Sequence, residues 1–153
     1  MSEHAIRELC PITPRDAGEV LTLQRAAYAT EAQLYSDPHL PALTQTLAEL
    51  SAELEGPALG IRLDGRLVGA VRWTVHEGVA HIGRLVVAPD LQGTGIGTAL
   101  LHAAEATSGA DEFTLFTGHL SAANLRLYGR EGYRRVREEE LRPGVVLIHL
   151  HKP

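Results

Sequence analysis

Residues 90–105, DLQGTGIGTALLHAAE, place three glycines within five positions and then continue as an alanine- and leucine-rich stretch. This continuation predicts a helix that runs to about residue 106. The first N–H groups of a helix have no partner within it, and the helix dipole places about half a positive charge there. Glycines before a helix leave these N–H groups open to a phosphate or diphosphate, although close packing of the helix on a sheet explains the same glycines equally well.

Two common phosphate-binding motifs do not fit this glycine segment. A Walker loop requires Lys before its final Ser or Thr, whereas Gly97 precedes Thr98 here. A dinucleotide-binding fingerprint requires G-x-G-x-x-G, and its last position falls on Thr98 when counted from Gly93 and on Leu100 when counted from Gly95. Neither motif is therefore present.

Two acidic-glycine pairs, Asp64-Gly65 and Glu77-Gly78, separate three apolar runs at 58–63, 66–75 and 79–87. Such pairs are the strongest short-range signal for hairpins, so an antiparallel meander is expected. The third run carries apolar residues on both alternating faces, which predicts a central strand covered by helices on both sides. Its two faces are expected to carry Leu85 and Val87 on one side and Ile82 and Val86 on the other.

The other elements bring the expected order to β-α-α-β-β-β-α-β-α-β-β, an α/β fold with about seven strands and about four helices. They are a strand over 5–9, a helix over 13–28 with Thr13 as N-cap, a loop over 36–41, a second helix with Leu43, Leu47, Leu50 and Leu54 on its apolar face, a strand over 112–119, a helix from Ser121 to about Glu131 ended by Gly132, and strands around 133–138 and 144–151.

Composition narrows the class of protein. With 153 residues, a single domain over 1–153 is expected. The chain has 14 basic and 19 acidic side chains, which argues against a nucleic-acid partner. No apolar run has the length of a membrane span, and the first residues lack the apolar centre of a secretory signal, so a cytoplasmic protein without a membrane partner is predicted. The single cysteine, Cys10, is expected to be a structural thiol, and the scattered histidines predict no metal site.

The segment Gln92-Gly93-Thr94-Gly95-Ile96-Gly97 resembles the Q/R-x-x-G-x-G/A loop of the GNAT superfamily of acyl-CoA-dependent N-acetyltransferases. The preceding RLVVAPD is similar to the end of the family's fourth strand, and residues 121–133, SAANLRLYGREGY, resemble its later helix. The resemblance covers the whole chain and is distinctive over about residues 58–137. It implies the GNAT fold, a mostly antiparallel sheet with flanking helices.

The resemblance implies acetyl-CoA as cosubstrate. Its diphosphate would lie on the loop amides, and its pantetheine arm would pair with the fourth strand where that strand separates from the fifth. Asn124 is a further cofactor contact in a Ser-x-x-Asn version of the motif, in which Ser121 is expected only to cap its helix. The implied cofactor-binding residues are Leu85, Val86, Val87, Gln92, Gly93, Thr94, Gly95, Ile96, Gly97, Thr98, Asn124 and Tyr128.

For catalysis, the resemblance makes the Val87 N–H the donor to the oxyanion and Tyr128 the general acid. His81 falls where some relatives carry a catalytic carboxylate, so it is the first candidate for a base, and His119 is the second. Core packing is the structural alternative for Tyr128, and an ordinary strand position is the alternative for His81. Transfer of the proton to solvent would make a base unnecessary.

The segment between the first strand and the first hairpin closes over the acceptor in this family. Here Glu31, Tyr35 and Asp37 are the expected substrate-binding residues, together with His119, and they suit a cationic amine. Glu49, Glu53 and Glu55 are better explained as the solvated face of a helix.

These observations favour an N-acetyltransferase that acts on a primary amine of a small molecule or peptide by direct attack in a ternary complex. The alternatives are an acyl-CoA-binding sensor or interaction domain without turnover, and transfer of a longer or charged acyl group. Many members of the family form homodimers, but no feature of this sequence identifies an interface.

Overall fold

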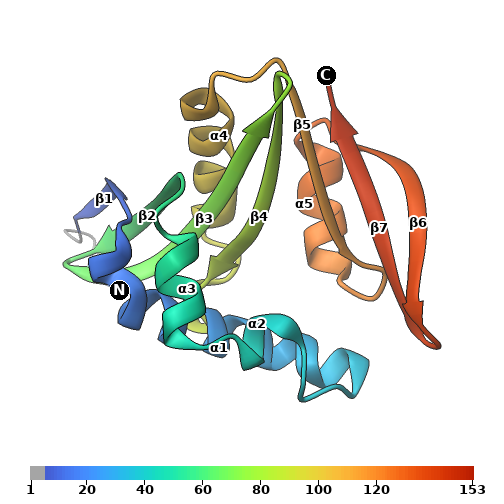
Figure 1. Cartoon of the computed structure of the whole chain (residues 1–153), viewed down its shortest axis with the longest axis horizontal. Helices are drawn as coiled ribbons and strands as arrows, with labels where there is room; N and C mark the ends of the chain where they lie inside the picture. The colour runs from blue at the N-terminus through green and yellow to red at the C-terminus, as the bar shows by residue number, and fades with distance from the viewer. Residues whose placement is uncertain (1–5) are drawn as a thin grey trace.

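A seven-stranded sheet forms the centre of the computed structural model, which describes residues 6–153 (Figure 1). The strand order is β1-β2-β3-β4-β5-β7-β6, and every pair is antiparallel except β4 and β5. This confirms the predicted mostly antiparallel sheet. The strands are β1 (Arg7–Pro11), β2 (Ala58–Leu63), β3 (Arg66–His76), β4 (Val79–Val87), β5 (Glu112–Gly118), β6 (Arg134–Arg142) and β7 (Val145–Lys152).

The predicted meander of β2, β3 and β4 is confirmed. Asp64 and Gly65 adopt φ values of 49° and 87°, and Glu77 and Gly78 adopt 50° and 79°. Positive φ at both central residues is the geometry of a type I′ turn, which matches the twist of the strands that it joins. The acidic-glycine pairs therefore fix the register of these hairpins locally.

Helices cover both faces of the central strands, as the apolar pattern of the third run predicted. A Cβ on Gly69 of β3 would lie 2.7 Å from side-chain atoms of Ile96 and Leu100, so this face of the strand meets a helix directly. Arg72, three residues further and on the opposite face, bonds to Gln24 of another helix. The helices are α1 (Ala17–Tyr35), α2 (Pro41–Thr44), α3 (Leu47–Glu53), α4 (Ile96–Ser108) and α5 (Ala122–Arg130), with 3-10 turns η1 (Pro14–Asp16) and η2 (Pro89–Leu91).

The single second helix expected after the 36–41 loop is wrong, because the chain forms two short helices, α2 and α3. Thr46 interrupts them with a capping box, in which its hydroxyl accepts from the Glu49 N–H at 3.1 Å and its own N–H donates to the Glu49 carboxylate at 2.9 Å. The predicted apolar face is also wrong at Leu47, which is 52% exposed, whereas Leu50 is fully buried.

Other boundaries differ by a few residues. The first strand covers 7–11 rather than 5–9, and residue 5 lies outside the described part of the chain. Helix α1 continues to Tyr35 rather than stopping at residue 28, and it ends at Ser36 in the left-handed conformation, with φ of 50°. Strands β6 and β7 are longer than expected and form one long hairpin.

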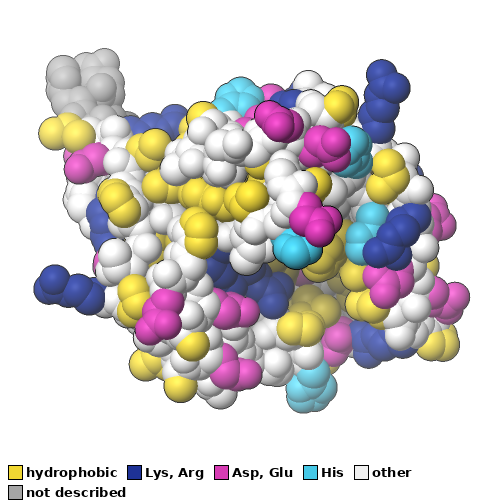
Figure 2. Space-filling model, turned by 45° about the horizontal axis from the view of Figure 1, so that its top comes forward, with side chains coloured by type: hydrophobic (Ala, Val, Ile, Leu, Met, Phe, Trp, Pro, Cys, Tyr) yellow, Lys and Arg dark blue, Asp and Glu magenta, His cyan; other side chains and the backbone are white. Residues whose placement is uncertain are grey.

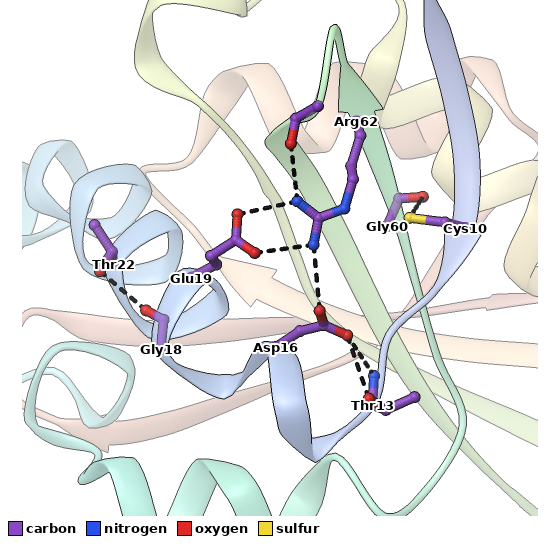
Figure 3. Close-up of polar contacts among 9 residues, drawn as sticks. Cys10, Thr13, Asp16, Gly18, Glu19, Thr22, Gly60 and Arg62 are labelled. Atoms are coloured by element: carbon purple, nitrogen blue, oxygen red, sulfur yellow. Dashed lines mark hydrogen bonds and ion pairs between the residues drawn. The ribbon is translucent and has the colours of Figure 1, made fainter.

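A polar cluster anchors the start of α1 to the sheet (Figure 3). The guanidinium of Arg62 on β2 donates two hydrogen bonds to Glu19, at 2.9 and 3.0 Å, and one to Asp16, at 3.2 Å. Asp16 also accepts from the Thr13 N–H at 2.9 Å. Beside this cluster, the Cys10 thiol lies 3.6 Å from a β2 carbonyl oxygen, and burial raises its pKa. These contacts set the direction of α1, whose later turns reach the cleft described below.

Candidate active site

Strands β4 and β5 pair at one end and separate at the other (Figure 1). Only Val79–His81 pair with Glu112–Thr114, whereas β4 continues to Val87 with β3 as its partner. The edge of β4 that faces β5 is therefore unpaired from Ile82 onward. A bulge at Arg84, which has a φ of 49°, shifts the β3–β4 register here, so the simple two-residue alternation predicted from 82 to 87 is interrupted.

A cleft of about 750 Å³ opens where the strands separate, between α1, β4, the glycine loop and α5. Figure 2 shows a face of the molecule that is hollowed near its centre, with basic side chains inside the hollow. Most of the residues predicted to bind the cofactor line this cleft. They are Leu85, Val86, Val87, Gln92, Gly93, Gly95, Ile96, Gly97, Thr98 and Asn124.

The glycine loop has the backbone that the sequence suggested. Gly93 and Gly95 adopt φ values of 74° and 87°, and a Cβ on either would meet nothing within 4 Å. Conformation, rather than crowding within the protein, therefore favours glycine at these positions. Helix α4 begins immediately after Gly95, so the N–H groups of its first turn have no intrahelical partner at the mouth of the cleft.

Two side chains brace this loop from within. The Gln92 amide donates to the Val87 carbonyl oxygen at 2.9 Å, and the Thr94 hydroxyl donates to the Leu91 carbonyl oxygen at 2.6 Å. Thr94, although predicted to bind the cofactor, does not line the cleft with its neighbours. The loop thus presents mainly main-chain groups to the cleft.

The N–H of Val87 faces away from β3. The Ala88 N–H donates to the Val68 carbonyl oxygen at 2.8 Å, and successive residues of an antiparallel strand direct their N–H groups to opposite edges. The Val87 N–H therefore points from the unpaired edge of β4 toward the space between β4 and β5. This is the geometry that a main-chain donor to a bound oxyanion requires.

Tyr128 lies on α5 beneath the cleft and is 5% exposed. Its ring packs 6.0 Å from that of Tyr133. Burial raises the pKa of Tyr128 well above its usual range, and the nearby Tyr28 and Glu31 raise it further. Its hydroxyl is therefore protonated at neutral pH, and it lies near two residues that line the cleft, although Tyr128 itself is not part of the lining.

A hydrogen-bonded chain connects α1 to the start of α5 along the cleft. The Ser121 hydroxyl donates to the Glu31 carboxylate at 2.6 Å, and the Tyr35 hydroxyl lies 3.1 Å from the Ser121 oxygen. The Tyr35 oxygen also accepts from the Leu120 N–H at 2.9 Å. The expected capping role of the Ser121 side chain is wrong, because this hydroxyl bonds Glu31 and makes no capping bond.

Asp37 and the histidines lie elsewhere. The Asp37 carboxylate is paired with Arg142 at the end of β6, which ties the β6–β7 hairpin to the end of α1. His119 accepts from a main-chain N–H of β7 at 3.2 Å, and His81 lies 2.8 Å from the Thr114 hydroxyl. The structure brings none of these three side chains into the cleft lining.

Sequence reasoning missed three arginines at or beside the cleft. Arg126 and Arg130 line it from one side of α5, and their four-residue spacing on a helix was an available signal. Arg84 carries no such signal, because only the bulge in β4 directs its side chain toward Tyr28.

Among residues 6–153, no three His, Cys, Asp or Glu side chains are grouped so that they could hold a metal ion. No helix in the same range is long and apolar enough to span a membrane.

Comparison with known proteins yields consistent matches. Residues 35–152 match the family model described as "Acetyltransferase (GNAT) domain". The structure of PaiA N-acetyltransferase from Thermoplasma acidophilum in complex with coenzyme A is similar, with a TM-score of 0.79 and 19% identity over 94% of this chain and 98% of that one. The structure of the ribosomal-protein-S18-alanine N-acetyltransferase from Escherichia coli is also similar, with a TM-score of 0.79 and 16% identity over 97% of this chain and 94% of that one.

In sequence, the chain is 29% identical over 136 residues to the UPF0157 protein YqkA from Bacillus subtilis. The match covers 88% of this chain and spans 39% of the length of that relative.

Proposed function

The chain belongs to the GNAT acetyltransferase family, and we propose that it transfers the acetyl group of acetyl-CoA to a primary amine of a small molecule or peptide. We also propose that residues 1–153 form one GNAT domain. The observation that supports the activity is a single cleft bordered by the glycine loop, the unpaired edge of β4, and α5, which carries Tyr128.

The cofactor end of the cleft fits coenzyme A. The loop amides and the first turn of α4 would receive the diphosphate, since the left-handed glycines leave these N–H groups unobstructed. The unpaired edge at Leu85–Val87 would pair with the extended pantetheine arm, as an added strand does. Bound there, acetyl-CoA would supply the thioester for attack.

Two groups of the chain would act on the reacting atoms. The Val87 N–H would donate to the carbonyl oxygen as the amine nitrogen bonds to the carbonyl carbon, and Tyr128 would give its hydroxyl proton to the sulfur as the C–S bond breaks. Solvent beside Glu31 would take the proton that the amine loses, and solvent would return a proton to the Tyr128 oxygen before the next turnover. His81, whose ring lies 2.8 Å from the Thr114 hydroxyl of β5, is the weaker choice for this step.

The test is release of free CoA thiol from acetyl-CoA across polyamines, amino acids, aminoglycosides and short peptides. Thiol release that depends on one class of amine supports the proposal. CoA binding by calorimetry without thiol release for any amine would instead support the acyl-CoA sensor, and thiol release only from longer or charged thioesters would change the acyl group transferred.

A further inference from the structure

Arg84 is a cation without an anionic partner at the bulge of β4. Among residues 6–153, no hydrogen bond or ion pair engages its guanidinium. Its φ of 49° belongs to the left-handed region, which residues other than glycine rarely occupy. Bulges of this kind redirect a side chain, and strained positions concentrate at functional sites.

The Arg84 side chain is directed toward α1. Its guanidinium carbon lies 5.9 Å from the centroid of the Tyr28 ring, and Tyr28 lines the cleft. Arg72 lies close by and is already bonded to Glu53 at 3.0 Å. Burial lowers the pKa of Arg72. The negative charge of Glu53 raises this pKa, whereas the positive charge of Arg84 lowers it further. The Arg72 charge is thus balanced within the fold, whereas the Arg84 charge is not.

An opposite charge lies one helical turn further along α1. Glu31 follows Tyr28 by three residues, so the two side chains share one face of the helix and both line the cleft. Ser121 holds one carboxylate oxygen of Glu31, and no bond to the other oxygen is made within residues 6–153. Tyr28 and Glu31 therefore belong to the lining of the cleft, and the Arg84 guanidinium lies beside that lining, over the Tyr28 ring.

The glycine loop follows the end of β4, so an arm that ends with its thioester at the Val87 N–H would run from the diphosphate toward the bulge. The acceptor would then approach from the side of the bulge, where Arg84 lies in β4. An uncharged amine or a diamine would leave the Arg84 charge unmatched, whereas a carboxylate on the acceptor would pair with it.

We propose that the acceptor is an amine that also carries a carboxylate, with Glu31 binding the amino group and Arg84 binding the carboxylate. This inference rests on the proposed acetyl transfer and names its substrate class. The carboxylate would act as a specificity group, since it lies outside the bond-making step.

The test compares each of three ω-amino acids, β-alanine, 4-aminobutyrate and 5-aminopentanoate, with its own primary amide. The wild-type protein, assayed with acetyl-CoA, is expected to favour at least one acid over its amide in kcat/KM. Arg84→Gln should lower kcat/KM for that acid about 10- to 100-fold and leave the amide nearly unchanged, because only the acid loses a charge-assisted bond. Arg84→Lys should recover part of the preference.

Arg15→Gln is the matched control, because it removes an equal charge from an exposed arginine in η1 that is not among the residues lining the cleft. Glu31→Gln should lower kcat/KM for acid and amide alike. Arg84→Gly, which relieves the left-handed backbone, replaces Arg84→Gln if the latter lowers the melting temperature.

Equal losses for acid and amide in Arg84→Gln, or a wild-type preference for the amides, would overturn the proposal. A dependence on Arg84 that appears only with succinyl-CoA and a neutral amine would place the carboxylate on the acyl group and overturn it as well. A complete lack of thiol release with every amine, while CoA still binds, would instead contradict the proposed acetyl transfer itself.

Discussion

The two ends of the cleft are built from different parts of the chain. At the end formed by β4 and the glycine loop, main-chain groups face the cleft, and the side chains of Gln92 and Thr94 bond back to the loop. At the end formed by α1 and the start of α5, side chains such as Glu31 and Ser121 face each other. Substitutions at the first end should therefore act through backbone conformation, and those at the second through the loss of a functional group.

Tyr128→Phe tests the proposed general acid, which lies on α5, and it should have the largest effect. We expect kcat to fall about 100-fold or more, because the general acid is lost while the ring stays in place. Thiol release at saturating acetyl-CoA and amine measures this. Because the pKa of Tyr128 is raised, wild-type kcat should show no loss from phenol ionisation between about pH 7 and pH 10.

The affinity of Tyr128→Phe for CoA, measured by calorimetry, should stay within about twofold of wild type, because the main-chain end is untouched. Unchanged turnover in this variant would remove Tyr128 from the mechanism.

Gly95→Val tests the main-chain end. Valine at a φ of 87° is strained, and its side chain would stand at the first turn of α4, so we expect the Kd for CoA to rise at least about 10-fold. Isothermal titration with CoA measures this, and circular dichroism checks the fold. Normal CoA affinity in a folded Gly95→Val protein would contradict the proposed diphosphate site.

Gly118→Ala tests the side-chain end through packing. A Cβ on Gly118 would lie 1.9 Å from the Tyr35 hydroxyl oxygen, so Tyr35 must move and release Leu120 and Ser121. We expect the free energy of unfolding to fall by about 1–3 kcal/mol, as for other overpacked sites. The KM for the amine should rise several-fold while the Kd for CoA changes little.

Gly129→Ala is the matched control, because a Cβ there meets nothing within 4 Å and the residue lies within α5. Its stability should equal or slightly exceed that of the wild type. A rise in the Kd for CoA as large as the rise in KM for the amine in Gly118→Ala would show that the two ends are not separable.

Thr94→Ala should have the smallest effect. It removes the bond from the Thr94 hydroxyl to the Leu91 carbonyl oxygen and leaves the loop backbone free to keep its course. We expect the Kd for CoA to change by less than about threefold, in line with the loss of one neutral hydrogen bond. A tenfold loss of affinity would mean that the side chain, and not only the main chain, contributes to this end.

The hairpins and the glycine loop could be predicted because their conformations are decided by neighbouring residues. Glycine at positions 65, 78, 93 and 95 tolerates the positive φ that each turn requires, so the sequence identifies the turn without the rest of the fold. The resemblance of residues 92–97 to a known loop then gave the family. The predicted unbroken second helix was wrong where a local capping box outweighed a leucine repeat that alone suggests one helix.

The end formed by α1 and the start of α5 could not be predicted in the same way. Ser121 and Glu31 are 90 positions apart, and nothing near either residue reveals their hydrogen bond. Asp37 follows α1, which carries the cleft residue Glu31. The long β6–β7 hairpin nevertheless brings Arg142 to Asp37, and the ion pair neutralises the Asp37 carboxylate. Long-range packing decides which polar side chains remain free for a ligand.

By itself, the sequence determined the order of the strands, the turns of the β2–β3–β4 meander and the glycine backbone before α4, but not the division of the second helix into α2 and α3. The tertiary structure alone decided where β4 leaves β5, how the bulge turns Arg84 toward Tyr28, and which carboxylates stay open to the cleft. The physical reason is that backbone conformation depends mainly on adjacent residues, whereas the pairing of charges depends on surfaces that meet only when the chain has folded.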